Sequence, residues 1–334
     1  MKHLVPLGVS VFLLLSCSGN QSAPVLHKSS RLLMGTLVEI TLVGENEKTE
    51  SATQAIIAEM ERIEKLTSFH KPSELTRVNA NAGNGAIKAH GELLKIVAEA
   101  LRIAQQTQGA FDPTIGAVSR LWQFSGPDEA RLPAESEITA ALQKVGWDRV
   151  KVDPKEGTVL LPETGMALDL GGIVKGYTLN RVGDIIKRAG LSGALVNLGG
   201  DILALGEKDT GRPWRVGVED PRNNRGIVAV TQLKDRMIFT SGDYERYFIK
   251  DGQRYHHILD PNTGYCADNL RSATIVGPIG MTLQPLGTAA FVMGVEKGLK
   301  LIQSVEGTRG FLIDSEGKYH LTDGAETIFK MESQ

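Results

Sequence analysis

Residues 168–205 read LDLGGIVKGYTLNRVGDIIKRAGLSGALVNLGGDILAL, and the chain changes there from helix-like to strand-like sequence. Gly176–Ala189 has apolar residues at helical spacing, and Gly190 is placed to end that helix. Ala194–Leu205 is instead a β-like run broken by Gly and Asp. Most predicted helices precede this change and most predicted strands follow it. This order, without regular β-α alternation, predicts an α+β fold.

The segments on either side of this stretch follow the same division. Upstream, the periodicity predicts a strand over 33–43, helices over 48–66, 92–106 and 136–145, and a hairpin over 150–161. Downstream it predicts strands over 214–219, 227–233, 237–241, 246–250 and 272–276, a helix over 295–304, and a hairpin from 311–313 and 319–321. No repeat and no Pro-rich or Gly/Ser-rich linker interrupts residues 33–329, so one compact domain is predicted.

Two glycine clusters in the opening stretch could carry chemistry. Asp169, the pair Gly171–Gly172 and Lys175 lie close together before the predicted helix. Glycine lets the backbone approach a phosphate, and the amides of a helix N-terminus carry partial positive charge. The spacing matches neither the P-loop nor the Rossmann fingerprint, so an anion site and a plain turn with an exposed lysine are equal alternatives. At Leu198–Asp201 a type I′ or II′ hairpin turn is favoured over a ligand loop.

Three further segments carry polar groups suited to a ligand. Asp112 precedes a proline that favours extended backbone; it either bonds a ribose or an adenine amine, or caps the local backbone. His256 and His257 are neighbours on a strand-like run and should point to opposite faces. A neutral imidazole there could take a proton from an attacking hydroxyl, although for His256 a structural role is favoured. Ser241–Tyr247 either touches a ligand or faces water.

The N-terminus is interpreted as a targeting segment. Lys2 precedes the apolar run Leu4–Leu15, which is too short for a permanent membrane span. The run ends at Cys17 in a sequence that resembles the lipobox of bacterial lipoproteins, which implies a diacylglycerol on that thiol; an ordinary secretory signal is the alternative. Residues 18–30 are small and polar, as in a tether. The expected divisions are a signal peptide (1–16), a lipidated tether (17–30) and a folded domain (31–334).

Charge and cysteine content narrow the possible partners. The formal net charge of −2 at pH 7 argues against nucleic acid, which needs a basic surplus. The chain has two cysteines, so Cys266 has no partner if Cys17 carries lipid. The core alone must then hold the fold, and the lipid would be the only membrane anchor.

Six segments in series resemble the ApbE flavin transferases, periplasmic lipoproteins also called FAD:protein FMN transferases. The resemblance extends from Met34 to about Gly298 and is carried by SFHKPSELTRVN (68–79), GAFDPTIG (109–116), LDLGGIVKGY (168–177), NLGGD (197–201), SGDYERYF (241–248) and YHHILDPNTG (255–264). It implies an α+β fold of the kind called T-fold-like. It also implies a Mg²⁺-dependent reaction that cuts FAD, moves FMN to a threonine hydroxyl of an acceptor protein and releases AMP.

The resemblance also implies partners and site residues. The acceptors would be subunits of membrane redox complexes, and the enzyme would sit on the periplasmic side of a bacterial membrane, more often the inner one. His257 would be catalytic and handle the proton of the incoming hydroxyl. The implied FAD contacts are Met34, Ala110, Phe111, Asp112, Asp169, Lys175 and His256. The implied metal ligands are the carbonyl of Gly172 and the side chains of Gln284 and Thr288.

Gln284 departs from the family pattern, which has an aspartate at this position. Its amide can offer an oxygen to Mg²⁺ but brings no negative charge, so the pyrophosphate would have to supply it. Two other functions therefore stay open. One is an FAD pyrophosphatase that yields FMN and AMP, and the other is a non-catalytic FAD-binding lipoprotein.

Overall fold

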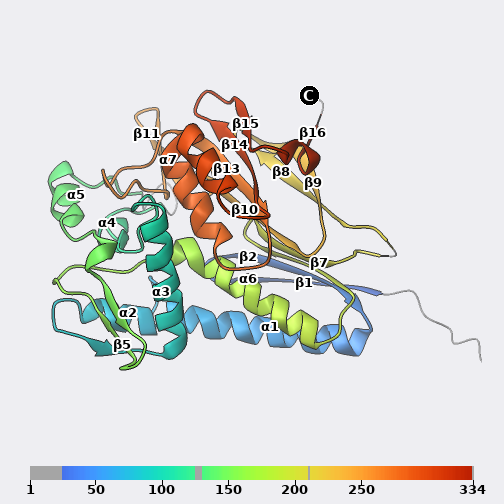
Figure 1. Ribbon diagram of the computed structural model, residues 1–334, viewed down its shortest axis with the longest axis horizontal. Coiled ribbons are helices and arrows are strands. Elements are labelled where there is room, and N and C mark those ends of the chain that lie inside the picture. Colours follow the sequence, from blue (N-terminus) through green and yellow to red (C-terminus); the bar gives the residue numbers. More distant parts are fainter. Residues whose placement is uncertain (1–24, 125–129, 210, 333–334) are drawn as a thin grey trace, which may run out of the picture.

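An antiparallel eight-stranded sheet forms the centre of the molecule (Figure 1), in a computed structural model that describes residues 25–124, 130–209 and 211–332. Its strand order is β1-β2-β6-β7-β10-β13-β14-β15. The strands are β1 (Val25–Leu33), β2 (Thr36–Gly44), β6 (Gly193–Leu198), β7 (Asp201–Gly206), β10 (Arg236–Gly242), β13 (Leu270–Gly277), β14 (Arg309–Asp314) and β15 (Tyr319–Leu321). The α+β class is confirmed.

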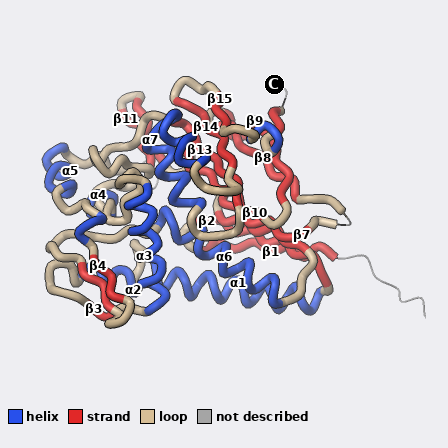
Figure 2. Tube along the Cα trace, in the orientation of Figure 1, coloured by secondary structure: helices blue, strands red, loops and turns tan. Residues whose placement is uncertain are grey.

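Four helices pack on one side of this sheet, three of them directly against it and the fourth, over residues 91–106, against two of the others (Figures 1 and 2). They are α1 (Asn46–Thr67), α3 (Gly91–Gln106), α6 (Gly171–Arg188) and α7 (Leu283–Gln303). On α1, Ile56 and Met60 lie one helical turn apart and are fully buried. They share a core cluster with Ile40 and Leu42, which alternate along β2 toward the helices. Burying each of these side chains contributes about 2 kcal/mol, so the sheet and its helices form one core.

A second, three-stranded sheet covers the opposite face. Its order is β16 (Lys330–Met331), β9 (Asn223–Leu233), β8 (Trp214–Asp220). Trp214, Val216 and Val218 are buried in alternation with exposed residues along β8. They form one apolar cluster with Ile238 and Phe311 of the large sheet. The large sheet is therefore packed on both faces, which makes the molecule a single domain of three layers.

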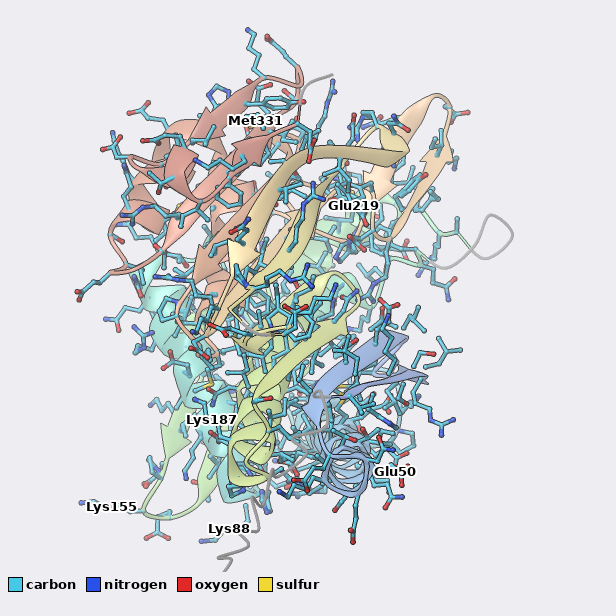
Figure 3. The ribbon with its side chains drawn as sticks, turned by 90° about the vertical axis from the view of Figure 1, so that its right-hand side faces the viewer. Glu50, Lys88, Lys155, Lys187, Glu219 and Met331 are labelled. Carbon is cyan, nitrogen blue, oxygen red and sulfur yellow. The ribbon has the colours of Figure 1, made fainter. Side chains whose placement is uncertain are left out.

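Short elements complete the domain: α2 (Glu74–Ala80), α4 (Gly116–Ser119), α5 (Glu135–Leu142), 3₁₀ turns (Trp147–Arg149 and Ala325–Thr327), the sheet of β3 (Ile87–Lys88), β5 (Thr158–Leu160) and β4 (Lys151–Asp153), and the ribbon of β11 (Tyr247–Lys250) and β12 (Gln253–His256). Figure 3 shows Lys88 and Lys155 of the small sheet at the opposite end of the molecule from Glu219 and Met331. Within the described residues, no helix combines the length and hydropathy needed to cross a membrane.

Two element boundaries before residue 190 differ from those expected. Residues 25–30, expected in the tether, belong to β1. Their polar side chains gave no sign of a strand, but β1 pairs with β2 along its whole length, which satisfies its backbone hydrogen bonds. α6 begins at Gly171 rather than Gly176, so the glycine pair is the first turn of the helix. The hairpin turn favoured at Leu198–Asp201 is confirmed, and it joins two strands within the run Ala194–Leu205. The expected signal peptide and Cys17 lie outside the described residues.

Helix α7 is interrupted at Gly294, which has φ 77° and ψ −172°. Asn269 fills the space at this break, where its Nδ2 donates to the carbonyl of Val292 at 3.0 Å. The sequence predicts a helix only over 295–304, but the structure extends it back to Leu283. The small residues of 287–290 are helical because they let α7 lie close against β10 and β13.

Candidate functional site

The site is built around the first turn of α6. The Asp169 carboxylate closes this turn by accepting from the Gly171 N–H at 2.9 Å and from the Ser119 hydroxyl at 3.0 Å. The Asp169 N–H donates to the carbonyl of Pro113 at 2.7 Å. A carboxylate at a helix N-terminus is favourable for the helix dipole. Asp169 therefore fixes the start of α6 against the 113–119 segment.

Asn79 of α2 holds the same chain segment from another side. Its Nδ2 donates to the carbonyl of Leu168 at 2.9 Å, and its Oδ1 accepts from the Leu168 N–H at 2.8 Å. The side-chain amide thus pairs with both polar groups of one residue. Sequence reasoning found no role for Asn79, because its partner lies 89 residues along the chain.

Replacing Asn79 by Ala is expected to lower the free energy of unfolding by about 2 kcal/mol, since both backbone groups of Leu168 lose their partner. Asn79→Asp keeps the acceptor but sets a carboxylate oxygen against the Leu168 carbonyl, and it should cost at least as much. Urea unfolding followed by circular dichroism measures both. The exposed Asn84→Ala is the control and should change stability by less than about 0.5 kcal/mol. Equal losses of unfolding free energy in the Asn79 and Asn84 variants would contradict a stabilising role for the two Asn79–Leu168 hydrogen bonds.

Lys175 lies on the second turn of α6 and reaches a hairpin turn of the sheet. Its Nζ is 2.9 Å from Asp201 Oδ2 and 3.3 Å from the carbonyl of Gly199. The turn residues Gly199 and Gly200 have φ of 61° and 88°, the positive values that a type I′ hairpin needs. Burial raises the pKa of Asp201, and the Lys175 charge opposes that rise. The structure thus sets an ammonium group over a buried carboxylate beside the sheet.

A second hairpin turn lies beside the first, because β2 pairs with β6. Met34–Gly35 links β1 to β2, and both of its residues have positive φ. A Cβ on Gly199 would come within 2.2 Å of Thr36 Oγ1, so only glycine fits between the two turns. The Thr178 hydroxyl donates to the carbonyl of Val174 at 2.7 Å and lies 3.7 Å from Met34 Sδ, which places Met34 against α6. Met34 therefore lies on a turn, where the sequence alone placed a strand.

His257 approaches this region from the loop after β12, where its N–H donates to the carbonyl of Arg246 at 3.1 Å. Its Nδ1 is enclosed and finds no hydrogen-bond partner in the described part of the chain. Burial, assisted by the positive charges of Arg246 and Lys175, lowers the pKa of His257 to about 3. The ring is therefore neutral at pH 7 and has a free nitrogen.

His256 is occupied within the fold. Its Nε2 lies 2.9 Å from the carbonyl of Ala267, and its Nδ1 accepts from the Ile258 N–H at 3.3 Å. These partners assign the ring proton to Nε2. No ring nitrogen remains for FAD, which favours the structural role over the implied FAD contact. The neighbouring Cys266 is partly buried, and burial raises the pKa of its thiol to about 11.

Asp112 is also used locally. Its Oδ1 accepts from the N–H of Thr114 at 2.7 Å and from its hydroxyl at 2.6 Å, and its Oδ2 accepts from the Trp147 N–H at 3.2 Å. Of the two alternatives for Asp112, the geometry supports the cap. The ring of its neighbour Phe111 packs against α6 at Gly172, where a Cβ would lie only 2.9 Å from the ring. Ala110 is buried in the main core.

The three residues implied as metal ligands meet at the same helix start. A Cβ on Gly172 would lie 3.7 Å from Thr288 Oγ1. Gln284 Oε1, however, accepts from the Gly176 N–H at 3.0 Å, and its Nε2 donates to the carbonyl of Gly171 at 2.8 Å. Both polar atoms of the Gln284 side chain, which the resemblance implies as a metal ligand, are therefore engaged with the α6 backbone. In the described ranges, no cluster of three or more His, Cys, Asp or Glu side chains could hold a metal.

The loop after β10 contributes groups that the sequence flagged only as a polar segment. Asp243 points inward, where both guanidinium nitrogens of Arg222 bind its carboxylate at 2.8 and 2.6 Å. Glu245 is exposed and lies beside the first hairpin turn, Gly199–Gly200, with Oε1 3.6 Å from a Cβ built on Gly200. The sequence places Asp201 beside its glycine pair but does not predict its ion pair with Lys175. No sequence pattern joins Arg222 to Asp243, since they lie on different hairpins.

The helix start, the lysine over a buried carboxylate and the neutral histidine with a free nitrogen all belong to one end of the sheet. Amides at a helix start, a nearby cation and a group with a strongly shifted pKa are typical of a protein that binds and acts on a phosphate-containing nucleotide. The sequence model of the ApbE family matches residues 34–312. The chain belongs to the ApbE family.

Relatives and solved structures agree over most of the chain. The FAD:protein FMN transferase of Haemophilus influenzae is 32% identical over 319 residues, which cover 91% of each chain. That of Treponema pallidum is 31% identical and covers 92% of this chain and 90% of the relative. The crystal structure of the ApbE protein from Thermotoga maritima superposes with a TM-score of 0.84 at 33% identity, covering 91% of this chain and 99% of that one. The resemblance stated from the six segments is confirmed.

Proposed function

We propose that the chain transfers FMN from FAD to a threonine hydroxyl of an acceptor protein and releases AMP. The observation that carries this proposal is His257, a neutral histidine whose free Nδ1 lies in the field of Lys175. The hydroxyl oxygen forms a bond to the phosphorus of the FMN half. The pyrophosphate P–O bond breaks, AMP leaves with that oxygen, and the hydroxyl proton passes to a base.

The chain's own residues can supply these needs. Lys175 holds the pyrophosphate by charge, and the positive end of the α6 dipole adds to this attraction. In the free protein, the positive charge of Lys175 helps to lower the pKa of His257. The bound anion offsets that charge. The pKa of His257 then rises toward the ordinary value, so that the ring accepts the hydroxyl proton more readily in the complex. Met34, which is only partly buried, offers apolar surface next to α6 for the aromatic rings of FAD.

The Mg²⁺ that the family resemblance implies does not fit the side chains that meet here. Mg²⁺ prefers carboxylate oxygens and substrate phosphates. Gln284 brings a neutral amide whose oxygen and nitrogen both bind the α6 backbone, and Thr288 brings only a hydroxyl. No step of the proposed reaction is therefore assigned to a metal held by the protein.

The test uses the full chain in detergent, FAD and an acceptor domain that carries a threonine flavinylation motif. Mass spectrometry follows the acceptor, and chromatography follows AMP and FMN. An acceptor that gains the mass of FMN less water, with AMP released, supports the transferase. Free FMN and AMP with an unmodified acceptor would replace it by a pyrophosphatase. Intact bound FAD would make the chain a flavin carrier, the alternative that Gln284 favours.

The proposed acceptors are subunits of membrane redox complexes, and the proposed location is the periplasmic face of a bacterial membrane, with lipid on Cys17. The first described strand begins at Val25. Residues 18–24 span at most about 25 Å when extended, so a lipid on Cys17 would keep the domain close to the bilayer. Acceptor threonines would then have to lie near the membrane surface.

Changing Cys17 to Ser is expected to move the protein from the membrane fraction to the soluble fraction, because the chain would lose its lipid attachment site. Fractionation with immunoblotting measures this, and mass spectrometry of the N-terminal peptide detects the lipid. Cys266→Ser is the matched control and should stay membrane-bound, since its thiol is partly buried within the fold. Membrane association of the Cys17 variant equal to that of the control would contradict the anchor.

A further inference from the structure

The side chain of Gln284 joins the starts of two helices. It belongs to the first turn of α7, and both of its polar atoms bind backbone groups in the first two turns of α6. Only 8% of the residue is exposed. We propose that Gln284 replaces a divalent cation at this junction, so that the chain closes the site by hydrogen bonds and binds FAD without a resident metal ion. The inference concerns the site of the proposed function, but its test requires no flavin transfer.

The orientation of the Gln284 amide follows from its partners. The Gly176 N–H can only donate, so the atom 3.0 Å away is the amide oxygen. The Gly171 carbonyl can only accept, so the atom 2.8 Å away is the amide nitrogen. A flipped amide would set donor against donor and acceptor against acceptor, which excludes it. The oxygen that a metal would need is therefore engaged with the helix.

A carboxylate at this position would behave differently. One of its oxygens could still accept from Gly176, but the other would face the Gly171 carbonyl as a second acceptor. Two oxygens at hydrogen-bond distance repel unless a proton or a cation lies between them. The amide NH₂ of Gln284 removes this need, because it supplies the positive partner itself. A carboxylate makes the junction depend on a cation, and the glutamine makes it independent of one.

The packing around the junction supports a direct contact between the helices. A Cβ on Gly176 would lie 3.0 Å from the carbonyl oxygen of Met281, just before α7. On the preceding turn of α6, Gly172 lies between Phe111 and Thr288. Glycines thus bring α6 within reach of a glutamine side chain, and the hydrogen bonds of Gln284 span the gap. No carboxylate of the described chain binds either polar end of this amide.

The decisive measurements are made on the unmodified full chain. FAD affinity is determined by fluorescence quenching in EDTA and in Mg²⁺, and Mn²⁺ binding without FAD is followed by electron paramagnetic resonance. We expect the two FAD dissociation constants to agree within about twofold and Mn²⁺ to remain free. Stoichiometric Mn²⁺ binding, or FAD affinity at least about tenfold tighter in Mg²⁺, would overturn the proposal.

Variants test the amide itself. Gln284→Glu preserves the size of the side chain, and it should lower the thermal midpoint in EDTA and regain it in Mg²⁺ or Mn²⁺. Gln303→Glu, the same change at an exposed position of α7, should do neither. A Gln284→Glu midpoint that does not respond to divalent cations would contradict the proposal. If transfer fails in every assay but these titrations behave as expected, the proposed function falls and this inference stands.

Discussion

Replacing His257 by Ala is expected to slow flavin transfer by about a hundredfold or more, a usual loss when a group that moves a proton is removed. FAD affinity should change by less than about threefold, since the contacts to the pyrophosphate come from α6 and Lys175. Single-turnover kinetics measure the rate of transfer, and fluorescence titration measures FAD binding. An equal loss of both quantities would make His257 a binding residue instead.

The pH dependence separates a proton-transfer role from a packing role. Because the pKa of free His257 is lowered to about 3, it should give kcat/KM no acidic limb above about pH 4. The kcat profile reports the FAD complex, where the bound anion raises this pKa, so its acidic limb should lie at higher pH. Tyr255→Phe on neighbouring β12 is the control and should leave both profiles unchanged, since its hydroxyl bonds only Gln253 at the surface.

Replacing Lys175 by Met should lower the free energy of unfolding by about 3 kcal/mol at pH 8, because the buried Asp201 carboxylate loses its counter-charge. Burial already raises the pKa of Asp201, and loss of Lys175 raises it further. A carboxyl whose folded pKa exceeds its unfolded pKa loses stability as pH rises between the two values. Urea unfolding should therefore show a smaller deficit at pH 5 than at pH 8.

A second substitution distinguishes the structural and binding roles of Lys175. Adding Asp201→Asn removes the unpaired charge, so the double variant should recover most of the lost stability. It should not recover FAD affinity, which we expect to fall at least about tenfold when the ammonium group is lost. Recovery of both properties would mean that Lys175 serves only as the counter-ion of Asp201. A stability deficit that does not vary with pH would contradict the buried ion pair.

The sequence predicted the features that depend on local chemistry. The stripe of α1, the glycine that ends α6 and the Gly199–Gly200 turn follow from periodicity and backbone preference, and all three are present in the structure. β1 was missed because KSSR looks like a solvated segment and only its pairing with β2 makes it a strand. The start of α6 was placed late because two glycines disfavour a helix, whereas Asp169 caps it.

Site residues were predictable as residue types, but their partners were not. Gln284 stood out in the sequence because an acid was expected there. The partners of its amide oxygen and nitrogen depend on how closely α6 approaches α7. The sequence does not show this approach, since Gly176 and Gln284 are 108 residues apart. Likewise, Asp112 and His256 have the right chemistry for a ligand. The structure engages their polar atoms internally, because burial requires that they be satisfied.

The two hairpin turns at the site belong to strands that share the β2–β6 ladder. Their separation is thus measured in strand spacings of about 4.8 Å, a repeat set by peptide hydrogen bonds rather than by side chains. Substitution of side chains in the sheet does not change this spacing. Substitutions of side chains in these strands should therefore leave the separation of Met34 and Gly199 unchanged.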